Sequence, residues 1–228
     1  MKISIIIPTL NEAENIGSLL NYLFKHGKEH LQEIIVVDGN SSDATQRIAR
    51  EAGARVLQQS IQSRAKQMNL GASEAQAEVL YFIHADTLPP ATFAEDIMAE
   101  LAAGYKMGCY RYQFDSPRTI LKFNAWFVQF QWLVCQGGDK TFFIQKEEFW
   151  AFNGYNERYV VMEEYDFLRR AMKQYPLRII PKNVIVSARK YEKNSWLRVQ
   201  IANALACTMF RSGTDPGRIR SVYKSILR

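Results

Sequence analysis

The sequence predicts an α/β domain with a central, mostly parallel mixed sheet flanked by helices, followed by a basic helical extension. Short apolar and β-branched runs alternate with segments of helical period, which is typical of parallel βα units. The chain has 228 residues, 47% of them hydrophobic, enough to bury one sizeable core. Nine basic and two acidic residues follow residue 188, so the formal net charge of +6 belongs to the end of the chain. We therefore expect a domain over 1–188 and an extension over 189–228 packed on it.

The expected elements follow in chain order. Apolar runs predict buried strands at 3–7, 34–37, 55–57 and 79–83. Apolar side chains at three- and four-residue spacing predict helices at 15–24, 43–52, 65–75 and 91–103. Beyond residue 103 the regular alternation is lost, and the remaining patterns predict a strand at 141–144 and helices at 167–174 and 196–210.

The cysteines and the apolar segments indicate the compartment. Cys109, Cys135 and Cys207 form no CxxC pair and predict neither a disulfide framework nor a zinc site, so we expect a reducing, cytoplasmic environment. The first apolar run ends at Pro8 and is shorter than the roughly 7–15 residues of a signal-peptide core. No uncharged stretch reaches the roughly 20 residues that span a bilayer. These observations argue against secreted, disulfide-rich and integral-membrane classes.

Polar residues follow three of the predicted strands, in the segments 8–12, 38–45 and 84–87. The carboxyl ends of parallel strands share one edge of a sheet, where α/β proteins bind ligands. Asp, Asn and Ser also favour turns and helix caps, so each residue taken singly has a structural interpretation. The three ends together favour a binding crevice.

Two common phosphate-binding motifs are absent from this crevice. Neither G-x-G-x-x-G after the first strand nor G-x-x-x-x-G-K-[ST] occurs, which argues against a dinucleotide oxidoreductase and a P-loop nucleotidase. A carboxylate at a strand end can accept hydrogen bonds from a base or ribose. A second carboxylate can hold a divalent cation that bridges phosphate oxygens. What remains is an α/β crevice with acidic strand ends.

An ordered set of segments resembles family 2 glycosyltransferases with the GT-A fold. The resemblance runs from about residue 3 to residue 189 and is carried by 8–12 (PTLNE), 36–39 (VVDG) with Ser41, Asp43 and Thr45, Arg64 with 67–71 (QMNLG), 82–87 (FIHADT), 137–139 (GGD) and 162–166 (MEEYD). Within the family, the segments 83–86 and 187–189 resemble small bacterial transferases associated with selenium-domain proteins.

The resemblance implies roles for particular residues. Nucleotide binding falls to Pro8, Thr9, Glu12, Asp38, Arg64 and Ala85, with Asp38 on the base, typically uracil, and Arg64 near the diphosphate. Asp86 would bind Mg²⁺ or Mn²⁺ on that diphosphate, and Glu164 would be the general base, with Glu163 as the alternative. Gly138 and Asp139 would lie on the acceptor side. A single base and no protein nucleophile imply sugar transfer with inversion, from a nucleotide-diphosphate sugar that is expected to be UDP-linked.

The sequence departs from the family at the metal position. His84 stands where the family has the first Asp of its Asp-x-Asp motif, and no histidine follows residue 84 to serve as a C-terminal ligand. A metal ion would then be held by Asp86, water and the donor phosphates, an arrangement that suits Mg²⁺. The other interpretation of His84 is a hydrogen-bonded histidine at a strand end with no metal contact. The residues Glu163, Glu164 and Asp166 are also explained as helix N-terminal charges.

Two apolar stretches have the composition of segments that lie on a membrane surface. The segment 123–138 is aromatic and uncharged, and 196–210 has helical apolar spacing ahead of a basic tail. Together, 123–138 and 196–228 predict peripheral contact with the anionic inner face of the cell membrane, which would suit a lipid-linked acceptor. Packing against the core explains the second stretch equally well.

Other functions stay open beside the transferase. One is a non-catalytic scaffold of this fold that binds nucleotide or membrane. The other is a nucleotidyltransferase, although its glycine-rich phosphate loop is not visible after Ile7. The basic extension has no nucleic-acid-binding motif, so no nucleic-acid partner is expected.

Overall fold

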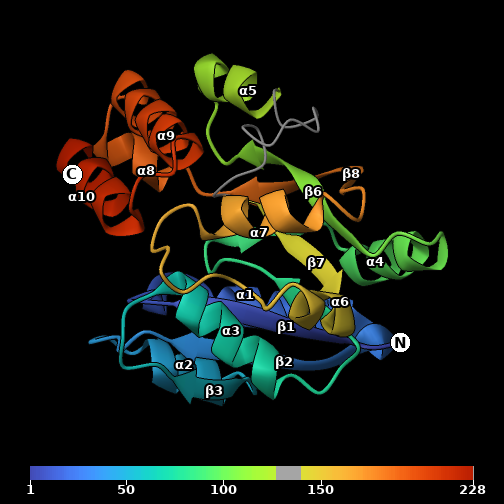
Figure 1. The fold of residues 1–228 in the computed structure, drawn as a ribbon. Coiled ribbons are helices and arrows are strands. Elements are labelled where there is room, and N and C mark those ends of the chain that lie inside the picture. Colours follow the sequence, from blue (N-terminus) through green and yellow to red (C-terminus); the bar gives the residue numbers. More distant parts are fainter. Residues whose placement is uncertain (127–139, 228) are drawn as a thin grey trace.

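The computed structural model describes residues 1–126 and 140–227 (Figure 1). Its strands are β1 (Ile3–Thr9), β2 (Leu31–Asp38), β3 (Arg55–Gln58), β4 (Val79–Phe82), β5 (Thr87–Leu88), β6 (Met107–Phe114), β7 (Phe142–Gln145) and β8 (Arg178–Val186). The described residues form one sheet with the strand order β3-β2-β1-β4-β7-β6-β8-β5. The pairs β1/β2, β1/β4, β2/β3 and β6/β8 are parallel, whereas β7 is antiparallel to both β4 and β6, and β5 is antiparallel to β8. The predicted mostly parallel mixed sheet is confirmed.

Helices cover both faces of this sheet. They are α1 (Ala13–Gly27), α2 (Thr45–Glu51), α3 (Arg64–Glu74), α4 (Phe93–Ala102), α5 (Thr119–Trp126), α6 (Lys146–Ala151), α7 (Glu163–Ala171), α8 (Arg189–Lys193), α9 (Trp196–Arg211) and α10 (Pro216–Ile226), with the short 3-10 helix η1 (Lys28–His30) after α1. One apolar cluster joins the sheet to α1, α2 and α4. A second cluster joins the opposite face to α3, α6 and α7.

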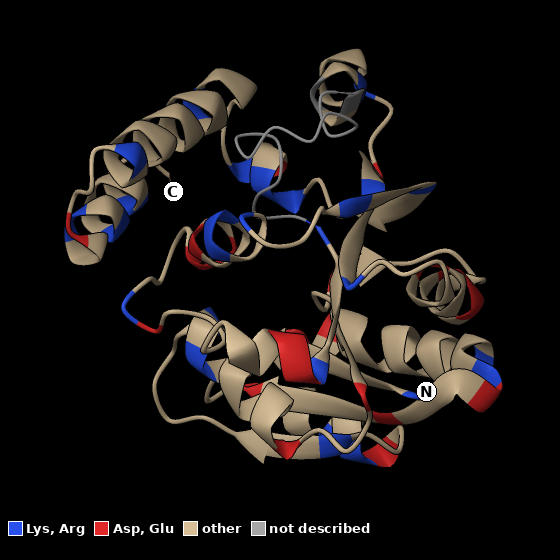
Figure 2. Ribbon diagram, turned by 45° about the vertical axis from the view of Figure 1, so that its right-hand side comes forward, with Lys and Arg blue, Asp and Glu red and all other residues tan. Residues whose placement is uncertain are grey.

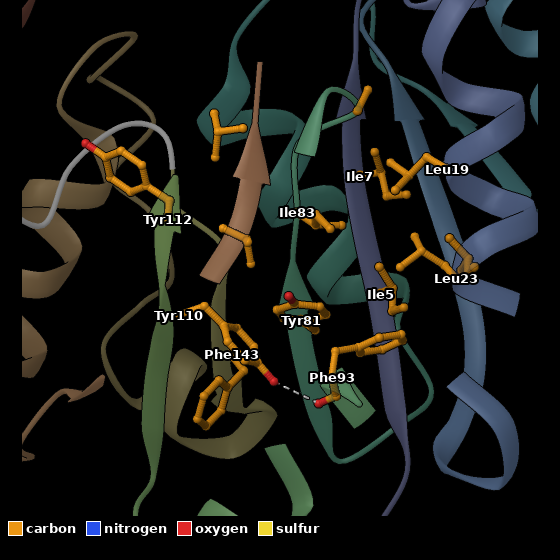
Figure 3. Packing of buried hydrophobic residues seen from close by; sticks show 14 of the residues in the cluster. Ile5, Ile7, Leu19, Leu23, Tyr81, Ile83, Phe93, Tyr110, Tyr112 and Phe143 are labelled. Atoms are coloured by element: carbon orange, nitrogen blue, oxygen red, sulfur yellow. Dashed lines mark hydrogen bonds between the residues drawn. The ribbon is translucent and has the colours of Figure 1, made fainter. Parts of the chain in front are cut away.

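Alternation along β1 explains the two clusters. Successive side chains of a strand point to opposite faces, so Ile5 and Ile7 belong to the first cluster and Ile6 to the second. Figure 3 shows Ile5 and Ile7 beside Leu19 and Leu23 of α1. A strand that is apolar on both faces is typical of a sheet with two helical layers.

Helix α3 lies very close to β1 at Gly71. A Cβ added to Gly71 would lie 2.5 Å from Ile6 Cγ2 and 3.1 Å from Val37 Cγ2, both on the sheet. Glycine is therefore required at this point of the helix if α3 is to keep its distance from the sheet.

The C-terminal helices pack against the domain and against each other. Val199 of α9 is fully buried in the first cluster. A third cluster joins Ala206 and Phe210 of α9, Ile219 of α10 and Met162 just before α7. The division of the chain at residue 188 stays a prediction. In the described part of the chain, every helix falls short of the length and apolar content that a bilayer crossing demands.

The sequence analysis missed several elements after residue 86, namely β5, β6, α5, α6 and β8. Strand β8 contains Pro181, which normally argues against a strand interior. The structure accommodates it at a register shift, because Ile180 pairs with Tyr110 whereas Asn183 pairs with Arg111. Gly138, Asp139 and most of the aromatic stretch 123–138 lie outside the described residues.

Candidate functional site

A cleft of about 690 Å³ opens at the carboxyl ends of β1 and β4. We call its first side the strand-end wall: residues 8–10 with Glu12, residues 62–64 with Gln67, residues 84–87 and residues 160–165. The opposite side, the helical wall, comes from α8–α10: Arg189, Lys190, Lys193, Asn194, Asn203, Ala206, Cys207, Arg220, Tyr223, Lys224 and Leu227. Eight predicted site residues line the cleft, namely Pro8, Thr9, Glu12, Arg64, Ala85, Asp86, Glu163 and Glu164.

Asp38 lies behind the strand-end wall rather than on it. Its side chain is fully buried and accepts hydrogen bonds from Thr9 Oγ1 at 3.2 Å and Gln46 Nε2 at 2.8 Å, and from both the backbone and the hydroxyl of Ser41. A carboxylate offers about four acceptor positions, and these contacts use them. A nucleobase would therefore reach Asp38 only by replacing one of these donors.

The polar loop after β2 has a structural role. Asn11 donates its backbone N–H to Ser41 Oγ, Glu12 donates to Thr45 Oγ1, and Ala13 donates to Asp43 Oδ2. The last two of these are backbone donors that a helix start leaves unsatisfied, since Glu12 is the N-cap residue of α1. The loop therefore fixes the entry to α1 and with it the position of Glu12.

Gln67 of α3 holds the two strand ends together. Its Nε2 donates to the carbonyl of Thr9 at 2.9 Å and to the carbonyl of Val37 at 2.7 Å. Both carbonyls lie at the carboxyl ends of their strands, so one buried amide fixes the spacing of β1 and β2. The structure thereby explains why a glutamine follows Arg64 by three positions.

Glu163 and Glu164 lie at the N-terminus of α7. Met162 precedes them with a left-handed φ of 75°, which is uncommon for a residue other than glycine. Asn69 of α3 fixes the approach to this turn, since its side chain exchanges two hydrogen bonds of 2.9 Å with the backbone of Tyr155. The interpretation of the acidic residues as first-turn charges of a helix is confirmed, and it leaves both side chains on the cleft.

One ion pair and one histidine–carboxylate contact organise the centre of the strand-end wall. Arg64 Nη1 lies 3.6 Å from Glu163 Oε1, and His84 Nε2 lies 3.6 Å from Glu164 Oε1. Burial raises the pKa of Glu163 to about 7, against the opposing effect of Arg64. A carboxyl group with such a pKa can accept a proton near neutral pH. His84 thus faces the predicted base rather than completing an acidic metal motif.

Arg189 crosses the cleft from the start of α8. Its Nη2 donates to Glu12 Oε1 at 2.7 Å and to Asp86 Oδ2 at 3.3 Å, and its Nη1 donates to Glu12 Oε2 at 3.3 Å. The hydrogen bond to Glu12 raises the pKa of the guanidinium. The sequence analysis treated Arg189 as the start of the basic extension and as part of the 187–189 resemblance. It gave Arg189 no place in the site, because no local pattern connects it with residues 103 and 177 positions away.

These side chains do not form a ready site for a divalent cation. Asp86 already faces Arg189, and His84 faces Glu164. The described residues contain no group of three or more His, Cys, Asp or Glu that could hold a metal ion. Binding of Mg²⁺ or Mn²⁺ at Asp86 therefore stays a prediction, and it needs oxygen ligands from elsewhere.

The helical wall is basic and largely exposed. Figure 2 shows Lys and Arg along the C-terminal helices, where Asp and Glu are few. Lys193, Arg220 and Lys224 are exposed, whereas Lys190 is half-buried and donates to the hydroxyl of Tyr223 at 2.6 Å. Among the described residues, none of these four cations lies in an ion pair with a carboxylate.

Comparison with known proteins identifies the family. The family model described as Glycosyl transferase family 2 matches residues 4–165. Glycosyltransferase AglJ of Haloferax volcanii is 30% identical over 104 residues, which are 45% of this chain and 33% of AglJ. The chain thus matches a third of the length of that relative.

Solved structures share the fold at low sequence identity. The mannosyltransferase PcManGT from Pyrobaculum calidifontis, solved with GDP-Man and Mn²⁺, aligns with a TM-score of 0.68 and 18% identity over 98% of this chain and 68% of its own. Glucosyl-3-phosphoglycerate synthase from Mycobacterium tuberculosis, solved with Mn²⁺, UDP and glucosyl-3-phosphoglycerate, gives 0.64 and 18% over 93% and 80%. The predicted GT-A fold is confirmed. Because the family model spans most of the chain, this protein belongs to glycosyl transferase family 2.

Proposed function

We propose that the chain transfers a sugar, with inversion, from a nucleotide-diphosphate sugar to an acceptor hydroxyl. The observation that carries the proposal is that one cleft holds both the Glu163–Glu164 pair and five of the six predicted nucleotide-binding residues, all except Asp38. PcManGT was solved with GDP-Man, and the mycobacterial synthase with UDP, so these similar structures support a nucleoside-diphosphate donor without choosing its base. UDP is the expected nucleotide because of the resemblance stated above. The narrower likeness to selenium-domain-associated transferases also stays a prediction.

The proposed reaction is a single displacement. The acceptor oxygen forms a bond to the anomeric carbon while the bond from that carbon to the diphosphate oxygen breaks. Glu164 takes the acceptor proton. His84 orients the Glu164 carboxylate, with its Nε2 3.6 Å from Glu164 Oε1. Glu163 is the alternative base, since its pKa of about 7 suits proton transfer at neutral pH. Arg64 faces the leaving diphosphate as a permanent charge, and a divalent ion, when bound, would neutralise the same group.

We place the acceptor between the N-terminus of α7 and the helical wall. The cations of that wall suit an acceptor with an anionic or lipid-linked part. Three side chains on the outer surface of α9, Leu197, Ile201 and Leu205, are 62%, 47% and 41% exposed at four-residue spacing. This stripe supports the proposed peripheral contact with an anionic membrane surface. The buried residues Val199 and Phe210 account for the rest of the predicted stripe by core packing.

Calorimetric titration with UDP, GDP, CDP and ADP, each with and without Mg²⁺ or Mn²⁺, tests the donor proposal. We expect one nucleoside diphosphate to bind selectively and Arg64→Gln to weaken it at least about tenfold, the size of a lost charged hydrogen bond. Arg47→Gln removes an equal charge from an exposed pair on α2 and should leave binding unchanged. Binding of none of the four would contradict the proposal and favour the scaffold.

The products separate the two enzyme classes. Sugar transfer or slow donor hydrolysis releases a nucleoside diphosphate, whereas nucleotidyl transfer from a nucleoside triphosphate releases pyrophosphate. We expect nucleoside diphosphate from a nucleotide sugar and no pyrophosphate from UTP or GTP in the presence of sugar phosphates. Release of pyrophosphate alone would favour the nucleotidyltransferase.

A further inference from the structure

We propose that Arg189 is a built-in cation of the donor site, which binds the donor diphosphate beside Asp86 so that donor binding does not require a divalent metal ion. This inference rests on the proposed function and adds a binding residue to it. It starts from the contacts of one side chain that reaches across the cleft.

The guanidinium of Arg189 is held in place but not saturated. It makes three hydrogen bonds, two to Glu12 and one to Asp86. An arginine has five N–H donors in a planar fork, so two donors remain for phosphate oxygens. The Arg189 side chain is 43% exposed and lines the cleft, so these donors are accessible to a ligand. A planar fork of this kind suits the geometry of phosphate groups.

The charges around Asp86 require a cation. Glu12 and Asp86 lie on the strand-end wall, with side chains only 15% and 28% exposed. Without Arg189, two carboxylates in a partly buried cleft would repel an approaching diphosphate. Because Arg189 contacts both, it reduces the local charge from two negative charges to one and adds donors of its own. A divalent ion reduces the local negative charge in the same way at other phosphate sites.

The same contacts explain why the site has few ligands for a divalent metal ion. A divalent cation binds through several oxygen ligands, and Asp86 is a single carboxylate that already faces a guanidinium. His84, two residues away, faces Glu164 instead. Among the described residues, Arg189 is the cation that lies within ion-pair distance of Asp86. Arg189 of α8 therefore supplies positive charge beside Asp86, where the protein offers too few ligands for a metal ion.

Calorimetry with UDP and GDP as probes, in excess EDTA and in saturating Mg²⁺ or Mn²⁺, tests the inference. We expect the wild-type chain to bind one of them in EDTA with nearly the affinity it has with metal. Arg189→Gln should weaken binding in EDTA by roughly 10- to 100-fold, the range of a charge-assisted hydrogen bond. Arg189→Lys keeps the charge but not the planar fork, so its affinity in EDTA should lie between those of the wild type and Arg189→Gln.

Three controls separate this role from a structural one. Arg218→Gln removes the same charge from an exposed position of α10 outside the cleft and should leave binding in EDTA unchanged. Direct Mn²⁺ titration of the nucleotide-free protein should show tighter binding by Arg189→Gln than by wild type, because Asp86 is released. Thermal unfolding of each variant reports whether the fold is intact.

The outcomes are distinguishable. If the wild type binds nucleotide only with metal, and Arg189→Gln behaves as wild type, the inference is wrong while the donor proposal stands. If neither nucleotide binds in either buffer, the proposed function fails and this inference fails with it.

Discussion

The two walls of the cleft differ in how their functional side chains are held. On the strand-end wall, Thr9 and Glu163 are 2% and 3% exposed, and the buried amide of Gln67 ties the strand ends together. On the helical wall, Lys193 and Arg220 are exposed, and in the described part of the chain neither pairs with a carboxylate. One wall has its geometry imposed by the sheet, whereas the other keeps its charges free for a ligand. Arg189 is the charged contact between them.

This difference suggests a division of labour. In the proposed reaction, chemistry at the anomeric carbon requires rigid placement, which the buried hydrogen bonds of the strand-end wall would supply. In the same proposal, binding of the acceptor falls to the long, exposed charged side chains of the helical wall. Variants of the first wall should therefore alter rate and stability, and variants of the second should alter binding alone.

The largest effect is expected from Glu164→Gln. Gln has the shape of Glu but cannot accept the acceptor proton, so we expect the transfer rate to fall by roughly 10²- to 10⁴-fold. Nucleotide affinity should change little. Glu192→Gln, an exposed carboxylate of α8, is the matched control and should keep the full rate. Full activity of both Glu164→Gln and Glu163→Gln would show that this pair is not the base.

The pH dependence should report on Glu163. Burial raises its pKa from 4.5 to about 7, so the folded protein holds this proton more tightly than the unfolded chain. Stability from this group is therefore present below about 4.5 and is lost as pH rises towards 7. If Glu163 must be ionised for transfer, the rate should rise up to about tenfold per pH unit below 7. Glu163→Gln should flatten the pH dependence of stability, measured by urea unfolding, and that of the transfer rate, measured by initial rates. Unchanged pH profiles would contradict their assignment to Glu163.

A stability effect is expected where α3 meets the sheet. Gly71→Ala places a Cβ 2.5 Å from Ile6 Cγ2, so we expect a loss of about 1–3 kcal/mol in the free energy of unfolding. Ser73→Ala on the exposed side of the same helix should stay within about 0.5 kcal/mol. If Gly71→Ala were as stable as Ser73→Ala in denaturant titrations, α3 would not pack against β1 as closely as the geometry indicates.

The smallest effects are expected on the helical wall. Lys193→Gln, Arg220→Gln and Lys224→Gln should each change stability by less than about 0.5 kcal/mol, because the side chains are exposed. Each should weaken binding to vesicles of anionic lipid by about 1 kcal/mol at low salt. Leu197→Ser and Ile201→Ser should weaken it further through lost apolar contact. A wild-type chain that fails to sediment with such vesicles even at low salt would remove the membrane proposal.

The strand-end wall was the more predictable from sequence for a physical reason. Its residues lie within a few positions of apolar strands, so local patterns indicate both the strand and the edge at which Thr9, Glu12 and Asp86 emerge. Asp38 is held mainly by the nearby residues Ser41 and Gln46, but the side chains that each carboxylate engages are set by the folded loop. The reach of Arg189 depends on residues more than a hundred positions away, which no local pattern reveals. Strand β8 was missed because Pro181 interrupts its pattern, and only the pairing with β6 shows how the strand absorbs it.

Hydrogen–deuterium exchange, with and without the tightest-binding of the four nucleoside diphosphates, tests the two-wall site most directly. We predict slower exchange in peptides covering 8–13, 62–68, 84–87 and 187–193, with no change in 197–205 on the outer surface of α9. Protection of the strand ends and of α8 together would support a donor held between the walls by Arg189. Protection confined to α9 and α10, with the strand ends unchanged, would contradict it.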